Sequence, residues 1–240
     1  MLLMDVFSYF LDSLKHRGVL SALAALLRRS AVFIRDLAPS RRRMRYGDIQ
    51  FDFDHSVDTT WANLPLRTRA REILMDAQYQ ATDPVVFGEL MQCFAIDHSK
   101  FTFVDLGSGK GRVLLMAAEY PFKRIIGVEL LPELSAVAEA NLRRVRERAS
   151  EISTNQIELR LGDARDFEFP NEPLLVYLFN PFPEFVVRRV LGNLEESIRR
   201  HPRPVYVAFH NNVYADVFTS VPSLRKVAES PAYVIYASPG

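Results

Sequence analysis

Three glycines stand at every second position in the stretch "VDLGSGKGR", directly after an apolar run. Gly107, Gly109 and Gly111 leave the backbone free to turn sharply and to touch a ligand, because glycine carries no side chain. A helical pattern starts at once, so the unpaired N–H groups of its first turn face the same place. Asp105, two residues before the first glycine, suits a cationic ligand group and would repel a pyrophosphate. The stretch therefore predicts a site for a positively charged ligand.

Two further acids follow apolar runs. Glu129 ends the second run, where a carboxylate can accept two hydrogen bonds from a ribose diol. Asp163, in "LGDARD", follows the third run and can bind the exocyclic amine of an adenine. The spacing G-x-G-x-G also differs from the dinucleotide spacing G-x-G-x-x-G. S-adenosylmethionine (SAM), which has adenosine at one end and a cationic amino acid at the other, fits all three features. An NAD-dependent oxidoreductase is the less favoured alternative, and a non-catalytic module that binds SAM or a nucleotide is another.

Continuous apolar runs alternate with amphipathic helical patterns from about residue 67 onwards. This alternation is typical of a parallel sheet covered by helices on both faces. We expect strands at residues 101–106, 124–128, 157–161, 174–179, 205–209, 224–228 and 232–236. We expect helices at residues 67–75, 83–94, 112–119, 132–149 and 183–200. The predicted fold class is α/β, a doubly wound and mostly parallel seven-stranded sheet with a C-terminal antiparallel hairpin strand, plus an N-terminal helical extension.

The beginning of the chain differs in charge from the rest. Residues 1–45 hold nine Lys and Arg and three Asp, a net charge of +6, which leaves −5 for the remaining chain. Helical patterns occupy much of residues 3–36, and the alternation Ile49, Phe51, Phe53 predicts a short strand. We divide the chain into an N-terminal helical extension or lid, 1–70, and a SAM-binding core, 71–240. A lid over the core is favoured, and docking on an acidic partner or peripheral contact with a membrane surface stays open.

Composition narrows the class of protein. A hydrophobic fraction of 48% and a net charge of +1 fit a globular domain and give no strong nucleic-acid signal. The single cysteine, Cys93, excludes an internal disulfide framework or a multi-cysteine metal site, and we expect no metal. No apolar run approaches the roughly 18 residues of a membrane span. Basic residues follow the apolar run 19–27, where a signal peptide would need a small-residue cleavage site. We therefore expect a cytoplasmic protein.

In these motifs the chain resembles the class I (Rossmann-like, seven-stranded) SAM-dependent methyltransferases over roughly residues 75–240. The resemblance is carried by "VDLGSGKGR", "GVEL", "GDA" and "LFNPF". In that family the glycine loop wraps the amino-acid and ribose parts of SAM, and the acid of the second strand binds the ribose hydroxyls. By position, the resemblance implies cofactor-binding roles for Asp105, Gly107, Gly109, Gly111, Glu129, Asp163 and Ala164. It also implies that the protein is an enzyme.

A second motif lies just ahead of the core. Tyr79 and Thr82, in "YQAT", resemble the Y-x-x-T segment of lysine methyltransferases that lack the SET architecture. There the tyrosine and threonine contact the methionine end of SAM, and an aromatic face attracts a sulfonium by about 0.5–2 kcal/mol. Thr82 before Asp83-Pro84 equally predicts a helix N-cap, and both roles can hold.

The candidate catalytic residues are Asn180, Pro181 and Phe182, at the end of the fourth strand. They resemble the N-P-P-Y/F signature of amino-group methyltransferases, with one proline missing. In that signature the Asn oxygen accepts hydrogens of the amine and the aromatic ring stacks on the target group, which would also bring Asn180 against the cofactor. A polar strand end with Phe182 in the core is the plainer alternative. The methyl acceptor, a protein lysine, another amine or the hydroxyl of a small molecule, stays open.

Two histidines are weaker candidates. His210 follows the fifth strand on the ligand side, where it is either a general base or, more commonly, a hydrogen-bonded structural residue. His55 stands among three aspartates, but their spacing matches no metal-ligand pattern. We expect the loop that contains it to pack over the mouth of the site, with Trp61 as an anchor.

Overall fold

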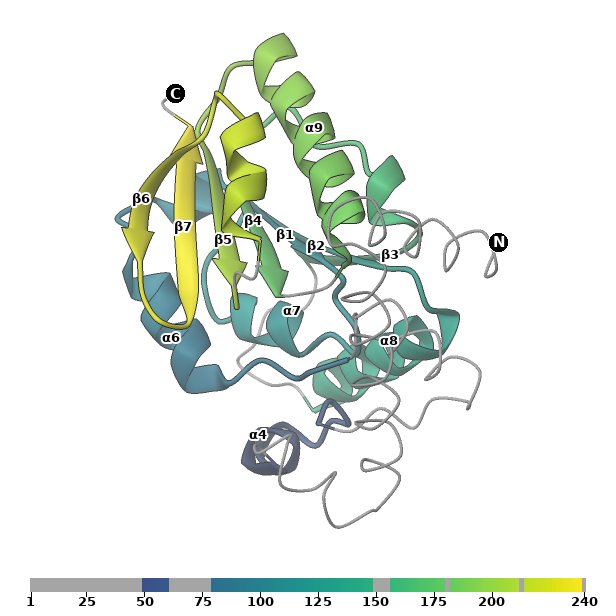
Figure 1. The fold of residues 1–240 in the computed structure, drawn as a ribbon. Helices are drawn as coiled ribbons and strands as arrows, with labels where there is room; N and C mark the ends of the chain where they lie inside the picture. Colours follow the sequence, from purple (N-terminus) through teal and green to yellow (C-terminus); the bar gives the residue numbers. More distant parts are fainter. Residues whose placement is uncertain (1–48, 61–78, 149–155, 180–181, 212–213, 239–240) are drawn as a thin grey trace, which may run out of the picture.

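A seven-stranded sheet forms the centre of the molecule (Figure 1). The computed structural model describes residues 49–60, 79–148, 156–179, 182–211 and 214–238. The strands lie in the order β3-β2-β1-β4-β5-β7-β6, so the direction in which the sheet grows reverses between β1 and β4. In an α/β sheet, the crevice past the carboxyl ends of the strands at this reversal is where ligands bind. The predicted doubly wound fold is confirmed.

The strands lie where the apolar runs predicted them, with each end within two residues. Six strands run in the same direction, and β7 is antiparallel to both of its neighbours, β5 and β6. Because most of these strands are buried on both faces, each reads as a continuous apolar run. Their bounds are β1 Thr102–Leu106, β2 Arg124–Glu129, β3 Ile157–Leu161, β4 Leu174–Phe179, β5 Val205–His210, β6 Arg225–Glu229 and β7 Tyr233–Ser238.

Alternate side chains of each strand pack into two separate cores, one on each face of the sheet. In β4, Val176 packs with α9 (Glu184–Arg200) and the 3₁₀ helix η4 (Ala215–Ser220). Its neighbour Leu175 packs with the helices of the opposite face. Those helices are α4 (Ile49–His55), α6 (Pro84–Gln92), α7 (Arg112–Ala117) and α8 (Pro132–Glu147). Shorter 3₁₀ turns are η1 (His98–Lys100) and η3 (Ala164–Asp166).

The strand predicted from Ile49, Phe51 and Phe53 is wrong, because these residues lie in the helix α4. Residues two apart point to different sides of a helix, whereas residues four apart share one side. Phe51 is accordingly 6% exposed and packs on the core, while Phe53 is 78% exposed. The rings of Phe51 and His55 stack with their centroids 4.2 Å apart. An alternation of only three apolar residues was too short to distinguish a strand from a helix.

The sequence suggested Thr82 as the N-cap of α6, but the N-cap is Asp83. The Asp83 carboxylate accepts a hydrogen bond from the Val85 N–H at 2.8 Å, and Pro84 takes the first helical position as expected. Thr82 is therefore free for another role, and its buried hydroxyl is hydrogen-bonded to the Tyr177 hydroxyl at 3.1 Å.

Several predictions fall outside the described residues and stay predictions. They are the helical patterns within residues 3–36, the helix at 67–75, the anchor Trp61 and the domain boundary near residue 70. Within the described part of the chain, no helix combines the length and the apolar character needed to cross a membrane.

The close packing of α7 on β2 gives a test of the fold. A Cβ on Gly127, in β2, would lie 2.5 Å from Leu114 Cδ1 and 2.9 Å from Ser108 Oγ. Since Leu114 is fully buried, it cannot move aside freely. We expect Gly127→Ala to lower the free energy of unfolding by about 1–3 kcal/mol. The matched control is Gly192→Ala in α9, where a Cβ meets nothing within 4 Å. This substitution should raise the free energy of unfolding by about 0.5–1 kcal/mol, because alanine favours a helix more than glycine does. Urea denaturation measures both, and equal effects would contradict the packing described.

Candidate functional site

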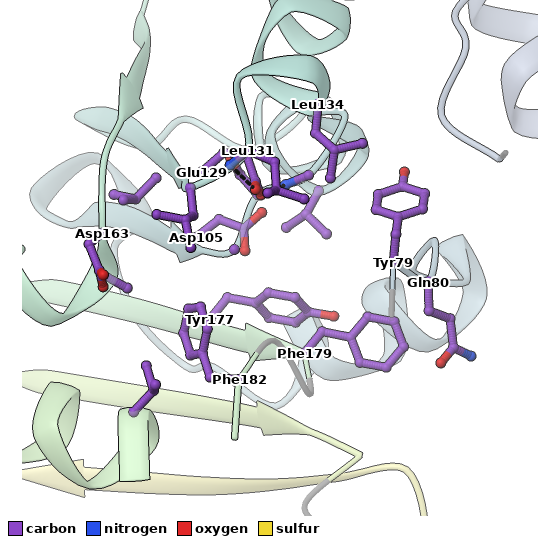
Figure 2. Close-up of a pocket in the computed structure, with 18 of the residues that line it drawn as sticks. Tyr79, Gln80, Asp105, Glu129, Leu131, Leu134, Asp163, Tyr177, Phe179 and Phe182 are labelled. Atoms are coloured by element: carbon purple, nitrogen blue, oxygen red, sulfur yellow. Dashed lines mark hydrogen bonds between the residues drawn. The ribbon is translucent and has the colours of Figure 1, made fainter. Parts of the chain in front are cut away.

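A cavity opens past the carboxyl ends of β1, β2 and β4, at the reversal of the strand order (Figure 2). Most of the residues that the sequence predicted for the site meet there. Those that line the cavity are Tyr79, Thr82, Asp105, Gly107, Gly109, Glu129, Asp163, Ala164 and Phe182. Gly111 does not line it, and Asn180 and Pro181 lie outside the described residues.

Asp105 is a buried carboxylate that faces the cavity with no hydrogen bond or ion pair from the described part of the chain. Its side chain is 3% exposed. Burial raises the pKa of Asp105 well above its ordinary range, and the nearby Glu129 carboxylate raises it further. An unpaired buried carboxylate is costly, and a cation in the cavity would remove that cost.

Glu129, at the end of β2, holds the glycine turn that follows β1. One carboxylate oxygen accepts a hydrogen bond from the Gly109 N–H and the other from the Leu131 N–H, each at 2.8 Å. Burial raises the pKa of Glu129, and the backbone hydrogen bonds offset part of this rise. A carboxylate can accept about four hydrogen bonds, so Glu129 keeps capacity for the ribose hydroxyls expected from the sequence.

The glycines of the turn have different surroundings. At Gly109, with φ of +53°, a Cβ would lie 2.5 Å from Cε2 of Tyr79, so the absence of a side chain lets that ring approach. At Gly111, with φ of +82°, a Cβ would lie 3.3 Å from the Cβ of Ala138. Gly111 is the N-cap of α7 and faces α8. Its place in the structure is a packing position behind the cavity.

Asp163, after β3, is already engaged by a neighbour. Arg165 Nη2 donates to one Asp163 oxygen at 2.6 Å, and the Arg165 backbone N–H donates to the other at 2.9 Å. The Arg165 carbonyl in turn accepts a hydrogen bond from Asn193 of α9 at 2.7 Å. This chain of contacts fixes the loop after β3, and the adenine contact predicted for Asp163 must share the carboxylate with Arg165.

The side of the cavity formed by β4 and the segment after it is aromatic. Figure 2 shows Tyr177, Phe179 and Phe182 opposite Asp105 and Glu129. Phe185, in the first turn of α9, completes this aromatic wall. Aromatic faces attract cations, so the two sides of the cavity favour the same class of ligand.

His210 lies behind the aromatic wall and is not among the residues that line the cavity. Its Nδ1 is hydrogen-bonded to the Tyr177 hydroxyl at 2.7 Å, and its ring stacks on Phe179 at 4.0 Å. Burial lowers the pKa of His210 to about 4, with a small opposing effect of Asp83. Of the two roles considered for this histidine, the structure supports the hydrogen-bonded structural one.

The sequence reasoning missed the residues that connect α4 to the glycine turn. Arg112, which directly follows Gly111, is 3% exposed and contacts the loop after α4. A charged residue at the start of the otherwise apolar "RVLLMA" of α7 is a signal that could have identified it. Its partners Asp52 and Thr59 carry no comparable signal, because they lie 60 and 53 residues away along the chain.

The residues present fit SAM, the ligand expected from the sequence. The buried Ser108 hydroxyl has no hydrogen-bond partner in the described part of the chain. It borders the cavity together with the Asp105 carboxylate, whose pKa is raised by burial and by the charge of Glu129. Buried polar groups in proteins are nearly always paired, so these two indicate a polar and cationic ligand. Asp105, Glu129, Asp163 and the backbone of the glycine turn would hold SAM, which supplies an activated methyl group when bound.

Comparison with protein-family models found a match whose range includes most of the residues of the site. A family model described as "Histone methylation protein DOT1" matches residues 68–175. The matched range contains Tyr79, the glycine turn, Glu129 and Asp163, and it ends before Asn180. No curated protein matches the chain.

Solved structures of methyltransferases resemble the chain at low identity. An RNA methyltransferase from Salinibacter ruber, solved with S-adenosyl-L-homocysteine, is 21% identical, with a TM-score of 0.42 and coverage of 66% of this chain and 92% of that one. The methyltransferase domain of a bacterial CtHen1 is 17% identical, with a TM-score of 0.46 and coverage of 64% and 96%. A ribosomal protein L11 methylase from Lactobacillus delbrueckii subsp. bulgaricus is 13% identical, with a TM-score of 0.45 and coverage of 64% and 77%.

The unpaired carboxylate gives a test of the site. We expect Asp105→Asn to weaken SAM binding about tenfold or more, because a charge-assisted contact is lost. The same change should stabilise the ligand-free protein at neutral pH. A raised pKa in the folded state means that the protonated carboxyl adds stability below its ordinary pKa of 3.8 and that this stability is lost as pH rises. The advantage of the variant over wild type should therefore grow as pH increases above about 4.

Isothermal titration calorimetry measures the affinity, and urea denaturation between pH 4 and 8 measures the stability difference. The exposed Asp166→Asn, outside the cavity, is the control and should change neither. A stability difference that is the same at every pH would contradict the electrostatics described.

Proposed function

We propose that this chain, a class I SAM-dependent methyltransferase, transfers the methyl group to an amino group, with a protein lysine as the first acceptor to test. An amine of a small molecule is the second form of the same proposal. The observation that carries it is the segment Asn180-Pro181-Phe182, which directly follows β4 and whose Phe182 lines the cavity.

The aromatic wall suits an amine that approaches the cavity. Phe179 and Phe182 lie on the side opposite the acids and offer ring faces to an alkylammonium group or to its neutral form (Figure 2). The Asn180 oxygen and a neighbouring backbone carbonyl would accept the hydrogens of the amine and direct its lone pair. Correct alignment of a nucleophile is worth several kcal/mol in a direct displacement.

The described residues of this wall offer no suitable base, and this also favours an amine. Among the described residues that line the β4 side, Tyr177 is the only titratable group, and burial raises its pKa far above 10. A neutral amine needs no general base for its attack, whereas an alcohol or a phenol must lose a proton. An amine that enters in its neutral form is therefore the acceptor that this wall serves best.

A protein acceptor has support from the comparison. The family model that matches residues 68–175 is named for histone methylation, which is a modification of protein side chains. The Y-x-x-T segment at Tyr79 and Thr82 belongs to the same matched range.

Substitution of Asn180 separates catalysis from cofactor binding. We expect Asn180→Ala to lower kcat with an amine acceptor by about 100-fold and to change the affinity for SAM by less than about threefold, since the lost contact is mainly with the acceptor. Release of S-adenosyl-L-homocysteine measures turnover. The control is Asn171→Ala, which removes an exposed amide outside the cavity. Wild-type turnover by Asn180→Ala would contradict the assignment.

The acceptor itself is identified from labelled products. Incubation of a protein extract with SAM labelled in the methyl group should yield methyl-lysine after complete hydrolysis of the labelled proteins. Label in a small-molecule amine would support the second form of the proposal. Label only in methyl ethers or esters would show that the acceptor is a hydroxyl or carboxyl group and would refute the amine.

A further inference from the structure

We propose that Asp52, acting with Arg112, is a positioning residue that sets the place of Tyr79, so that residues 49–60 form part of the cofactor site. Residues 49–60 precede the range matched by the family model. The sequence predicted that the loop around His55 packs over the mouth of the site, but it gave Asp52 no role of its own. The proposal rests on SAM as the cofactor and is independent of the nature of the acceptor.

The first step is that Tyr79 depends on Thr59. The Tyr79 hydroxyl donates a hydrogen bond to the carbonyl oxygen of Thr59, and the ring of Tyr79 lies against Gly109. Burial raises the pKa of the Tyr79 phenol, although the charge of Arg112 opposes this rise, so the hydroxyl stays protonated and remains a donor. Because Tyr79 lines the cavity, a shift of Thr59 would change the cavity wall.

The second step is that Thr59 depends on Asp52. Both carboxylate oxygens of Asp52 accept hydrogen bonds from the Thr59 N–H, at 3.0 and 2.9 Å, and one of them also accepts from the Thr59 hydroxyl. The Thr60 N–H donates to Asp52 at 2.7 Å. Burial alone would raise the pKa of Asp52, but the hydrogen bonds from Thr59 and Thr60 outweigh it and leave the pKa below its ordinary value. Asp52 is therefore an ionised clamp on the loop that follows α4.

The third step is that Arg112 joins this loop to the rest of the site. Its Nε donates to the Thr59 hydroxyl and its Nη2 to the Thr60 hydroxyl, each at 2.7 Å. Nη2 also lies 3.3 Å from Asp52, and Nη1 donates to the carbonyl oxygen of Thr82 at 3.3 Å. One planar guanidinium thus fixes the loop and the Tyr79–Thr82 segment relative to the first turn of α7.

A second attachment keeps the same loop on α8. The fully buried Asn141 accepts from the Asp58 N–H at 2.9 Å and donates to the Asp58 carbonyl at 3.0 Å. Lys110, inside the glycine turn, forms an ion pair with the Asp58 carboxylate at 2.7 Å. The loop is therefore fastened to the glycine turn and to both helices that border it, which is more than a connection between elements requires.

A matched pair of substitutions in α4 tests the proposal. Asp52→Asn keeps the shape of the side chain and weakens its hold on Thr59, whereas Asp54→Asn changes an exposed aspartate of the same helix. We expect Asp52→Asn to raise the Kd for SAM about tenfold and Asp54→Asn to leave it unchanged. Isothermal titration calorimetry on the full chain, without acceptor, gives these values, and urea denaturation of the ligand-free variants verifies that each is folded.

A double substitution separates positioning from a general loss of stability. Tyr79→Phe keeps the ring and removes the hydrogen bond to Thr59, so it should also raise the Kd about tenfold. If Asp52 acts through Thr59 and Tyr79, the double variant should bind SAM about as weakly as either single variant. Independent effects would multiply to about a hundredfold.

Wild-type affinity in Asp52→Asn, or multiplied effects in the double variant, would overturn the proposal. Failure of the wild-type protein to bind SAM would overturn it as well. Failure of the amine proposal has a different signature, namely normal SAM binding in the wild type with no methylated amine among the products.

Discussion

Asp105 is buried with no partner among the described residues, and this is the constraint on which the site depends. The strand order brings the ends of β1 and β2 together, and with them two carboxylates that disfavour each other's charge. Backbone N–H groups stabilise Glu129, whereas no group in the described part of the chain does the same for Asp105. Such an arrangement is stable enough only because a large core surrounds it, and it is useful only if a cation enters. The ligand-free protein therefore holds free energy that binding of a cationic ligand releases.

The glycine turn is held from two sides, and this determines which parts of the chain make the site. On the side of the sheet, Glu129 accepts a hydrogen bond from the Gly109 N–H. On the opposite side of the turn, the Tyr79 ring covers Gly109. The acids come from the core of the fold, whereas the cover comes from a segment whose contacts run through Arg112 to residues ahead of it. The cavity thus lies between the carboxyl ends of the strands and a segment that is held in place by hydrogen bonds of polar side chains.

Most of the sheet and most of the cavity lining could be predicted from the sequence, for a physical reason. A strand buried on both faces is a continuous apolar run, and a ligand at the ends of such strands needs its acids directly after those runs. Asp105, Glu129 and Asp163 carried this signal, and all three border the cavity. The hydrogen bonds of Arg112 with the loop after α4 could not be predicted in this way. They join residues more than fifty positions apart, and such contacts leave no local pattern in the sequence. The helix α4 was mistaken for a strand because Phe53 is apolar and yet exposed, which breaks the helical pattern that Phe51 and His55 follow.

The buried hydrogen-bonded chain Thr82–Tyr177–His210 has a consequence for the charge of the cavity. Because the pKa of His210 is about 4, its ring is neutral throughout the physiological pH range. Tyr177 is neutral over the same range, because burial raises its pKa. The aromatic side therefore has the same electrostatic character in mild acid and in mild base, and variable charge is confined to the acidic side. Acidification would change the protonation of an incoming nucleophile while the surface on which it rests stays the same.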